Sequence, residues 1–248
     1  MNTSFCMPVI TRLHDHYDSK YASASFREVS GVSRVKYPRD RLQMAVHLST
    51  MFAGERYLEI GAGNGSTMLT LLDSYRELVG TELSVVRARE LRNLFADYPQ
   101  VRIVENNFEE EPLPFPSEYF DTIALTAVIE HLFDPISTLR KLHRLLKPGG
   151  VVIVDTPNIA KWTRRVKLAF GYFPSTASLN EGLLCYDRKT PTDLHDEGHL
   201  HYFTFRSLRI IALERVGFRS AKGVGYGNSF LCRCWPQMFS EIAMVLCK

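Results

Sequence analysis

Short apolar runs alternate with amphipathic stretches along most of the chain, which is the pattern of strands and helices in turn. Helices are predicted over 40–52, where apolar residues recur from Leu42 to Phe52, and over 84–95, where Arg87 should face water. Because strands that alternate with helices pair in parallel, we expect a sheet with helices on both faces. The strands are predicted at five apolar runs, residues 57–60, 78–83, 101–104, 120–125 and 151–154.

The C-terminal part of the chain predicts one further helix and two further strands. Thr204 is a good N-cap for a helix over 205–216, and Gly217 is a good stop because glycine adopts the left-handed conformation at low cost. The two strands are predicted over 218–224 and 241–247.

The first strand leads into a turn with three glycines at alternate positions, Gly61, Gly63 and Gly65. Glycine is needed where φ is positive or where a ligand lies against the backbone, so a ligand is predicted at this turn. A dinucleotide fingerprint would need its third glycine one position later, where this chain has Ser66. With Glu59 before the first glycine, the sequence reads ExGxGxG and resembles motif I of the class I S-adenosylmethionine (SAM) methyltransferases.

That resemblance implies several residues at the cofactor. In the family, the glycine turn approaches the methionine part of SAM and the acid before it helps to hold the amino group. Glu82 ends the second strand, and Leu83 follows it. The number of residues between the glycines and Glu82 is typical of a carboxylate that reaches ribose hydroxyls. The residues implied at the turn itself are Glu59, Gly61, Ala62, Gly63 and Gly65.

Later segments add to this set. Asn107 stands where the family usually has an aspartate beside the adenine, and its amide oxygen can still accept a hydrogen bond from the adenine amino group. Phe108 would flank the adenine, and Thr126 and Ala127, at the end of the fourth strand, would line the methionine side. Tyr21 belongs to an N-terminal arm of the kind that closes over SAM in similar enzymes.

The order of the later segments supports the resemblance, which covers roughly residues 40–225. Residues 146–150, ending in Pro-Gly-Gly, predict a helix stop and a turn before the fifth strand. The resemblance implies a doubly wound, mostly parallel, seven-stranded α/β sheet whose last strand is antiparallel. We expect a single domain over 1–248, with an N-terminal arm over 1–38 and a lid or substrate insertion over about 157–203.

Three histidines are candidates for the chemistry. Methyl transfer to a hydroxyl requires a positioned acceptor and the removal of its proton, for which histidine is the usual side chain near neutral pH. His131 follows the fourth strand, and His199 and His201 lie in the insertion, with His199 the better candidate base. Alternatively, Glu130 and His131 cap or orient the following helix.

The insertion also has a second interpretation, as a metal site. Loops rich in histidine and aspartate are more often solvated than metal-bound, so no metal is expected. The ligands of such a site would come from His195, His199, His201, Asp193, Asp196 and Cys185.

Residues 161–170 interleave apolar residues with Lys161, Arg164, Arg165 and Lys167. A basic amphipathic helix of this kind can lie on an anionic membrane surface or bind a phosphate-bearing acceptor. The alternative is a lid helix over the active site whose basic face lies in water.

The composition of the chain limits which binding partners and which cellular compartment are expected. A formal net charge of +3 and a pI near 8.6 are too mild for a nucleic-acid surface, so no nucleic acid is expected. The five cysteines form no CxxC pair, and we find neither a secretory signal nor an apolar run of membrane-spanning length. These features favour a cytoplasmic protein.

The sequence therefore predicts a SAM-dependent methyltransferase that acts on an oxygen of a small-molecule, lipid-linked or glycan acceptor. The passage from 156 to 218 is similar to small-molecule O-methyltransferases, including ubiquinone-pathway and glycan-associated enzymes. One alternative is a non-catalytic SAM-binding protein, and another is a methyltransferase of RNA or protein. Residues 125–128, however, lack the Asn-Pro-Pro-Tyr type of motif that N-methyltransferases carry, and the glycine spacing disfavours a nicotinamide oxidoreductase.

Overall fold

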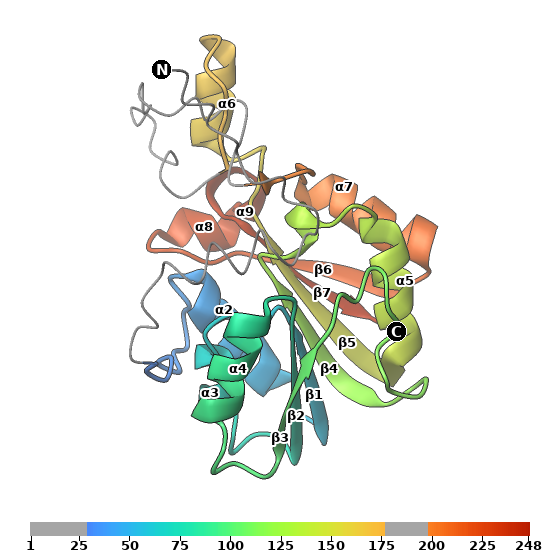
Figure 1. Ribbon diagram of the computed structural model, residues 1–248. Coiled ribbons are helices and arrows are strands. Elements are labelled where there is room, and N and C mark those ends of the chain that lie inside the picture. The colour runs from blue at the N-terminus through green and yellow to red at the C-terminus, as the bar shows by residue number, and fades with distance from the viewer. Residues whose placement is uncertain (1–28, 177–197) are drawn as a thin grey trace, which may run out of the picture.

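A single mixed sheet forms the centre of the computed structural model, which describes residues 29–176 and 198–248 (Figure 1). Its strands are β1 (Arg56–Ile60), β2 (Glu77–Glu82), β3 (Val101–Glu105), β4 (Phe120–Thr126), β5 (Leu146–Thr156), β6 (Ser220–Val224) and β7 (Ile242–Cys247). They lie in the order β3-β2-β1-β4-β5-β7-β6. Strand β7 runs antiparallel to both β5 and β6, and β1 to β5 pair in parallel. The predicted doubly wound, mostly parallel sheet is confirmed.

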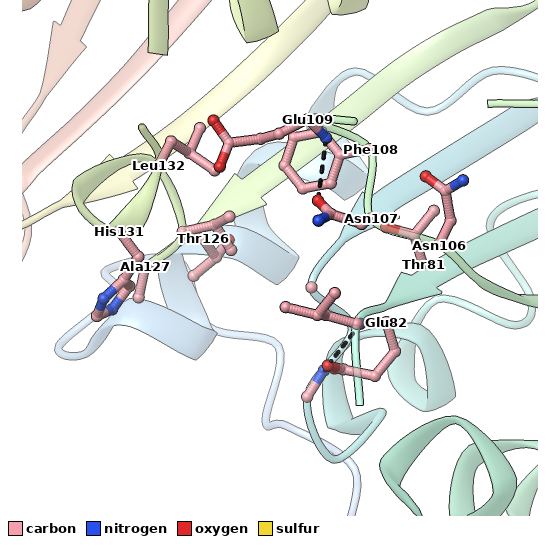
Figure 2. Close-up of a pocket in the computed structure, with 14 residues that line it drawn as sticks. Thr81, Glu82, Asn106, Asn107, Phe108, Glu109, Thr126, Ala127, His131 and Leu132 are labelled. Carbon is pink, nitrogen blue, oxygen red and sulfur yellow. Dashed lines mark hydrogen bonds between the residues drawn. The ribbon is translucent and has the colours of Figure 1, made fainter. Parts of the chain in front are cut away.

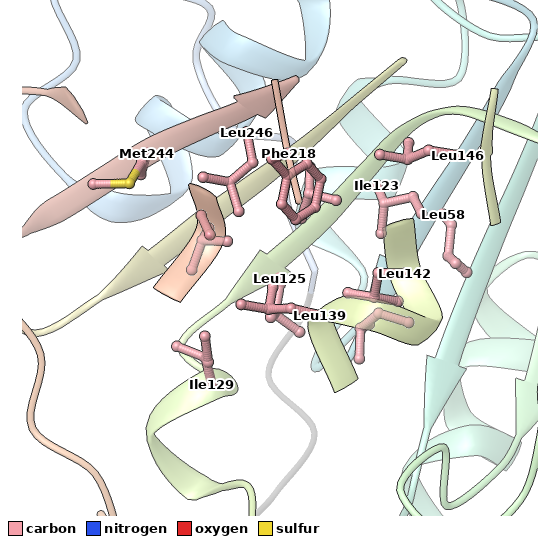
Figure 3. Close-up of a cluster of buried hydrophobic side chains, with 14 of the residues drawn as sticks. Leu58, Ile123, Leu125, Ile129, Leu139, Leu142, Leu146, Phe218, Met244 and Leu246 are labelled. Atoms are coloured by element: carbon pink, nitrogen blue, oxygen red, sulfur yellow. The ribbon is translucent and has the colours of Figure 1, made fainter. Parts of the chain in front are cut away.

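One face of the sheet is covered by α5 (Pro135–Leu145) and α7 (Phe205–Ile210). Leu139 and Leu142 of α5 belong to the same buried cluster as Leu58 and Ile123 of the central strands (Figure 3). Parallel strands that are buried on both faces read as continuous apolar runs, which is why the sequence showed them clearly.

The other face is covered by α2 (Arg41–Met51), α3 (Ser66–Thr70) and α4 (Val85–Leu94). Two details of the predicted helix faces are wrong. Leu42 and Met51 of α2 are exposed because they lie at the two ends of the helix. Arg87 of α4, which was expected to face water, is mostly buried, and its side chain pairs with Glu90 at 3.2 Å.

The helix predicted over 205–216 is confirmed, but its second half is wider than expected. Thr204 caps α7 by accepting a hydrogen bond from the Ser207 N–H at 3.0 Å. The chain then continues as η4, a π-helix over Ile211–Val216, and ends at Gly217 with φ at +100°. Nothing in the residue pattern indicated the π-helix.

The helix stop predicted over 146–150 is confirmed, since α5 ends at Leu145, but these residues already begin β5, and of them only Leu146 pairs with β4. Leu146 lies opposite Phe120, and the register shifts before Thr122 pairs with Val151. Gly149, with φ at +79°, lies within this irregular part of β5.

Four short helices complete the described part of the chain: η1 (Ile129–His131), α6 (Trp162–Ala169), α8 (Phe230–Cys234) and α9 (Pro236–Phe239). In Figure 1, α6 stands away from the sheet at the top of the molecule. No helix within the described ranges combines the length and apolar character that a membrane span needs.

Candidate active site

A pocket opens at the carboxyl ends of β1, β2 and β4, where the strand order reverses (Figure 2). Open α/β sheets bind ligands at this reversal, because the loops after the strands diverge there. The pocket is lined by Gly61, Gly63, Thr81, Glu82, Leu83, Asn106, Asn107, Phe108, Glu109, Thr126, Ala127, Val128, His131 and Leu132.

The glycine turn forms one wall of the pocket, and its three glycines have different tasks. All three have positive φ, between +58° and +82°. A Cβ on Gly63 would meet no atom closer than 4.0 Å, so the backbone there faces open space. A Cβ on Gly65 would instead lie 2.9 Å from Leu91 of α4. Gly65 therefore allows α4 to pack against the turn. The sequence had suggested that Gly65 lines the pocket, but it does not.

Glu82 fixes this turn from the neighbouring strand. Its carboxylate accepts hydrogen bonds from the backbone N–H group of Gly63 at 3.2 Å (Figure 2) and from those of Leu83 at 2.9 Å and Ser84 at 3.3 Å. Burial raises the pKa of Glu82, and the three donors oppose that rise. The carboxylate is thus held in one position at the edge of the pocket.

Glu59 lies behind the turn rather than in the pocket lining, because β1 directs its side chain into the protein. The side chain is 4% exposed, and its Oε2 atom has no hydrogen-bond partner in the described structure. Burial raises the pKa of Glu59 to about 8. The buried, unsatisfied oxygen of Glu59 is therefore a hydrogen-bond acceptor without a donor.

Ala62 does not line the pocket either, since it packs against Gly80 of β2.

Two neighbouring asparagines lie where the chain leaves β3. The Oδ1 atom of Asn107 accepts a hydrogen bond from the Glu109 N–H at 3.3 Å, which closes a local turn (Figure 2). Asn106 also lines the pocket, and its buried Oδ1 has no partner in the described structure. Sequence reasoning missed Asn106, although an amide next to the predicted one was a signal. Phe108 lines the pocket as expected.

The end of β4 carries an unusual backbone conformation. Ala127 has φ at +52°, which is uncommon for a residue with a side chain, and its N–H donates to the Asp155 carbonyl at 2.9 Å. Thr126, beside it in the pocket wall, has a buried hydroxyl with no described partner. Strained residues persist only where their surroundings hold them, and they gather at functional sites. Nothing in the sequence distinguishes this alanine from an ordinary one.

His131 and His199 meet at the rim of the pocket. Their ring centroids are 4.7 Å apart in an edge-to-face arrangement. The Nδ1 atom of His131 lies 3.1 Å from the Gly198 carbonyl oxygen, and that of His199 lies 2.6 Å from the Thr176 hydroxyl. His201 is not part of this group, since its ring lies beside Phe203 at a centroid distance of 6.1 Å.

Glu130 connects the two histidine segments. Its carbonyl oxygen accepts hydrogen bonds from the Leu200 N–H at 2.8 Å and the His201 N–H at 3.1 Å. The expectation that Glu130 and His131 cap the next helix is wrong, because Asp134 caps α5 by accepting from the Ser137 N–H at 2.9 Å. Instead, His131 lines the pocket and Glu130 lies buried next to it in the chain.

The helix over 161–170 is also different from the prediction. Arg164 is 1% exposed, and its guanidinium donates to Glu241 at 2.8 Å. Lys161 also donates to Glu241, at 2.7 Å, and Lys167 is buried. Of the four basic residues only Arg165 is exposed, so they do not form a basic face in water. Leu168 and Phe170 are exposed instead, so the predicted membrane contact stays a prediction that would depend on apolar residues.

Several residues of the sequence-based predictions lie outside the described residues. They are Tyr21 of the arm, and His195, Asp193, Asp196 and Cys185 of the alternative metal site.

The sheet topology, the glycine turn and the fixed acid on β2 define a Rossmann-like site for a nucleotide-type ligand. The chain belongs to the methyltransferase domain family, whose model matches residues 34–221. This confirms the resemblance to class I SAM-dependent methyltransferases, and with it SAM as the predicted cofactor.

Curated relatives match in part. The chain is 33% identical over 133 residues to a probable S-adenosylmethionine-dependent methyltransferase of Mycolicibacterium smegmatis, covering 53% of this chain and 50% of the relative. It is 36% identical over 107 residues to a ubiquinone biosynthesis O-methyltransferase of Ruegeria pomeroyi, covering 43% of each. The chain thus spans half the length of these relatives or less.

Solved structures agree on the fold. A SAM-dependent methyltransferase from Archaeoglobus fulgidus superposes with a TM-score of 0.57 at 16% identity, over 84% of this chain and 95% of that one. The CurJ carbon methyltransferase gives 0.53 at 22% identity, over 79% of this chain and 49% of that one. At these identities the likeness concerns the fold alone.

Proposed function

We propose that this protein transfers a methyl group from SAM to an oxygen of a small acceptor bound at the rim of the pocket. The observation that carries the proposal is the position of His131, which lines the cofactor pocket and contacts His199 at the same time. A side chain that can act on an acceptor hydroxyl thus lies next to the predicted cofactor site.

The residues present fit the cofactor. Gly63 leaves space that a Cβ would fill, and Glu59 has a buried oxygen without a donor, which an amino group would satisfy. Glu82 would hold the ribose hydroxyls, and Asn106 and Asn107 offer amide oxygens to the adenine amino group. When bound, SAM supplies a methyl carbon made electrophilic by the positively charged sulfur.

The chain's own task is then to orient the acceptor and to activate its hydroxyl. We assign the activation to His131 and His199, which lie together, and not to His201. The similarity to the Ruegeria pomeroyi O-methyltransferase supports oxygen as the methylated atom. Lipid-linked and glycan acceptors and a cytoplasmic location stay predictions.

The test is a calorimetric titration with SAM, followed by a screen for conversion to S-adenosylhomocysteine with phenolic, quinol and sugar acceptors. Binding with turnover on a hydroxyl acceptor is expected. Binding without turnover on any acceptor would favour a non-catalytic SAM-binding protein, and turnover on RNA or protein alone would contradict a small-molecule acceptor.

A further inference from the structure

We propose that Glu130, His131 and His199 bind a divalent transition-metal ion at the rim of the pocket. One ligand atom from each of these residues lies within 4.8 Å of the other two. Two imidazoles and one carboxylate are a common set of three protein ligands for zinc at sites that keep one coordination position open.

The carboxylate of Glu130 is buried and has an oxygen that could bind a cation. The residue is 1% exposed, and its Oε2 atom accepts a hydrogen bond from the Thr156 hydroxyl at 2.9 Å. Its other oxygen, Oε1, is buried and has no hydrogen-bond partner in the described structure. Leaving a buried acceptor unsatisfied is unfavourable, and a bound metal ion would remove that cost.

Both histidines are oriented as metal-binding histidines usually are. The Nδ1 atom of His131 contacts the Gly198 carbonyl oxygen at 3.1 Å, and the Nδ1 atom of His199 contacts the Thr176 hydroxyl at 2.6 Å. A ligating histidine typically makes such a hydrogen bond through one ring nitrogen and binds the metal through the other.

The donor set selects the kind of ion. Imidazole nitrogens suit Zn²⁺ and similar transition metals, whereas Mg²⁺ and Ca²⁺ prefer sites made of oxygen. The group is held together by the backbone, since the Glu130 carbonyl oxygen accepts from the Leu200 N–H at 2.8 Å, next to His199. The segment that carries His199 is therefore tied to the segment that carries the other two ligands.

The role of the ion rests on the proposed function, although its binding does not. His131 lines the pocket, so an oxygen of an acceptor could take the open coordination position beside the cofactor site. A metal ion lowers the pKa of a hydroxyl group or water molecule whose oxygen it binds. His131 and His199 would then activate the acceptor hydroxyl by holding the ion that binds it.

The test measures metal binding by the full chain without SAM. Titration with Zn²⁺ should show one site. His199→Ala should lower the Zn²⁺ affinity of this site by at least ~100-fold, because losing a ligand should cost no less than the largest loss seen when a partner behind a ligand is removed. Thr176→Val, which removes only the hydroxyl behind His199, should weaken it about 10–100-fold. Co²⁺ bound at the site should give visible absorption bands that His131→Ala abolishes.

The control is His47→Ala on α2, which removes a histidine far from the group in the fold and should leave Zn²⁺ affinity unchanged. Circular dichroism verifies that each variant is folded. Absence of Zn²⁺ binding to the unmodified chain, or binding that His199→Ala does not weaken, would overturn the proposal. A separate SAM titration keeps the two proposals apart, because SAM can bind whether or not the metal site exists.

Discussion

Glu82, at the end of β2, accepts a hydrogen bond from the backbone N–H of Gly63 at 3.2 Å, so the acid of one strand holds the turn that follows another. The two residues are 19 positions apart in the chain. The turn is therefore fixed by protein contacts alone, and the open space in front of Gly63 is ready for a ligand. A site that is ordered in advance loses less conformational entropy when it binds.

Replacing Gly63 with valine should abolish SAM binding while leaving the fold intact. The new side chain would enter the open space in front of the turn, and φ at +58° disfavours a branched residue. The backbone strain itself should cost of order 1–3 kcal/mol. Calorimetry with SAM measures the loss, and circular dichroism measures the fold.

The matched control is Gly149→Val. Gly149 has φ at +79°, a Cβ there would meet no atom within 4 Å, and the residue lies at the opposite end of β5 from the pocket. The control imposes similar backbone strain without entering the site, so it should keep SAM affinity. If both variants lose binding, strain rather than occupation of the pocket is responsible.

Local spacing explains why much of the site could be predicted. Gly61, Gly63 and Glu82 follow strand ends directly, so their places in a parallel sheet follow from their places in the sequence. Gly65 looked the same in the sequence, but its task depends on how α4 packs, which is a tertiary contact. The positive φ of Ala127 likewise follows from its surroundings in the fold and not from its identity.

The buried charges could not be predicted for the same reason. Arg164 lies in a helix that reads as basic and amphipathic, and a charged residue in such a helix normally faces water. Its partner Glu241 is 77 positions away, so the sequence near Arg164 contains no trace of the pair. The contact between His131 and His199 also joins distant segments. The sequence placed His199 ahead of His201 as a base but did not predict that contact.

Glu59 should make the stability of the protein depend on pH. Burial raises its pKa from the usual 4.5 to about 8, so the folded state keeps a proton that the unfolded chain releases. Between these pH values the folded state binds more protons, and its free energy of unfolding falls as the pH rises. Glu59→Gln should remove this contribution, leaving a variant that is more stable than the original at pH 8 but binds SAM more weakly.

Urea denaturation at several pH values measures this effect. Glu214→Gln removes the same charge from an exposed position on η4 and controls for the change in net charge. Equal slopes of stability against pH for the original protein and Glu59→Gln would contradict the assignment of the slope to Glu59.

The buried pair of Arg164 and Glu241 should hold α6 against the end of β7. Burial alone would raise the pKa of Glu241, but Arg164 and Lys161 hold it below its ordinary value. Glu241→Gln leaves two cations without their carboxylate, one of them fully buried, and should cost about 3–5 kcal/mol. Because the pKa is lowered, the contribution of Glu241 is present at neutral pH and is lost on acidification through that pKa.

Arg76→Gln provides the comparison, because it breaks an exposed ion pair with Glu55. The side chain of Arg76 is 86% exposed and that of Glu55 is 55% exposed. Exposed pairs contribute only about 0–1 kcal/mol, so this variant should unfold at nearly the original urea concentration. A similar small effect for Glu241→Gln would show that the buried pair does not stabilise the fold. Addition of Arg164→Met to Glu241→Gln should cost less than the sum of the two single changes.

His199→Ala should separate catalysis from cofactor binding. His199 does not line the cofactor pocket but contacts His131, which does, so SAM affinity should stay within a factor of about two of the original. Loss of a group that activates the acceptor hydroxyl should lower kcat by about 10²–10⁴-fold. Calorimetry with SAM and the release of S-adenosylhomocysteine give the two values, with His47→Ala as the control. Unchanged turnover in His199→Ala would exclude this histidine from the activation of the acceptor.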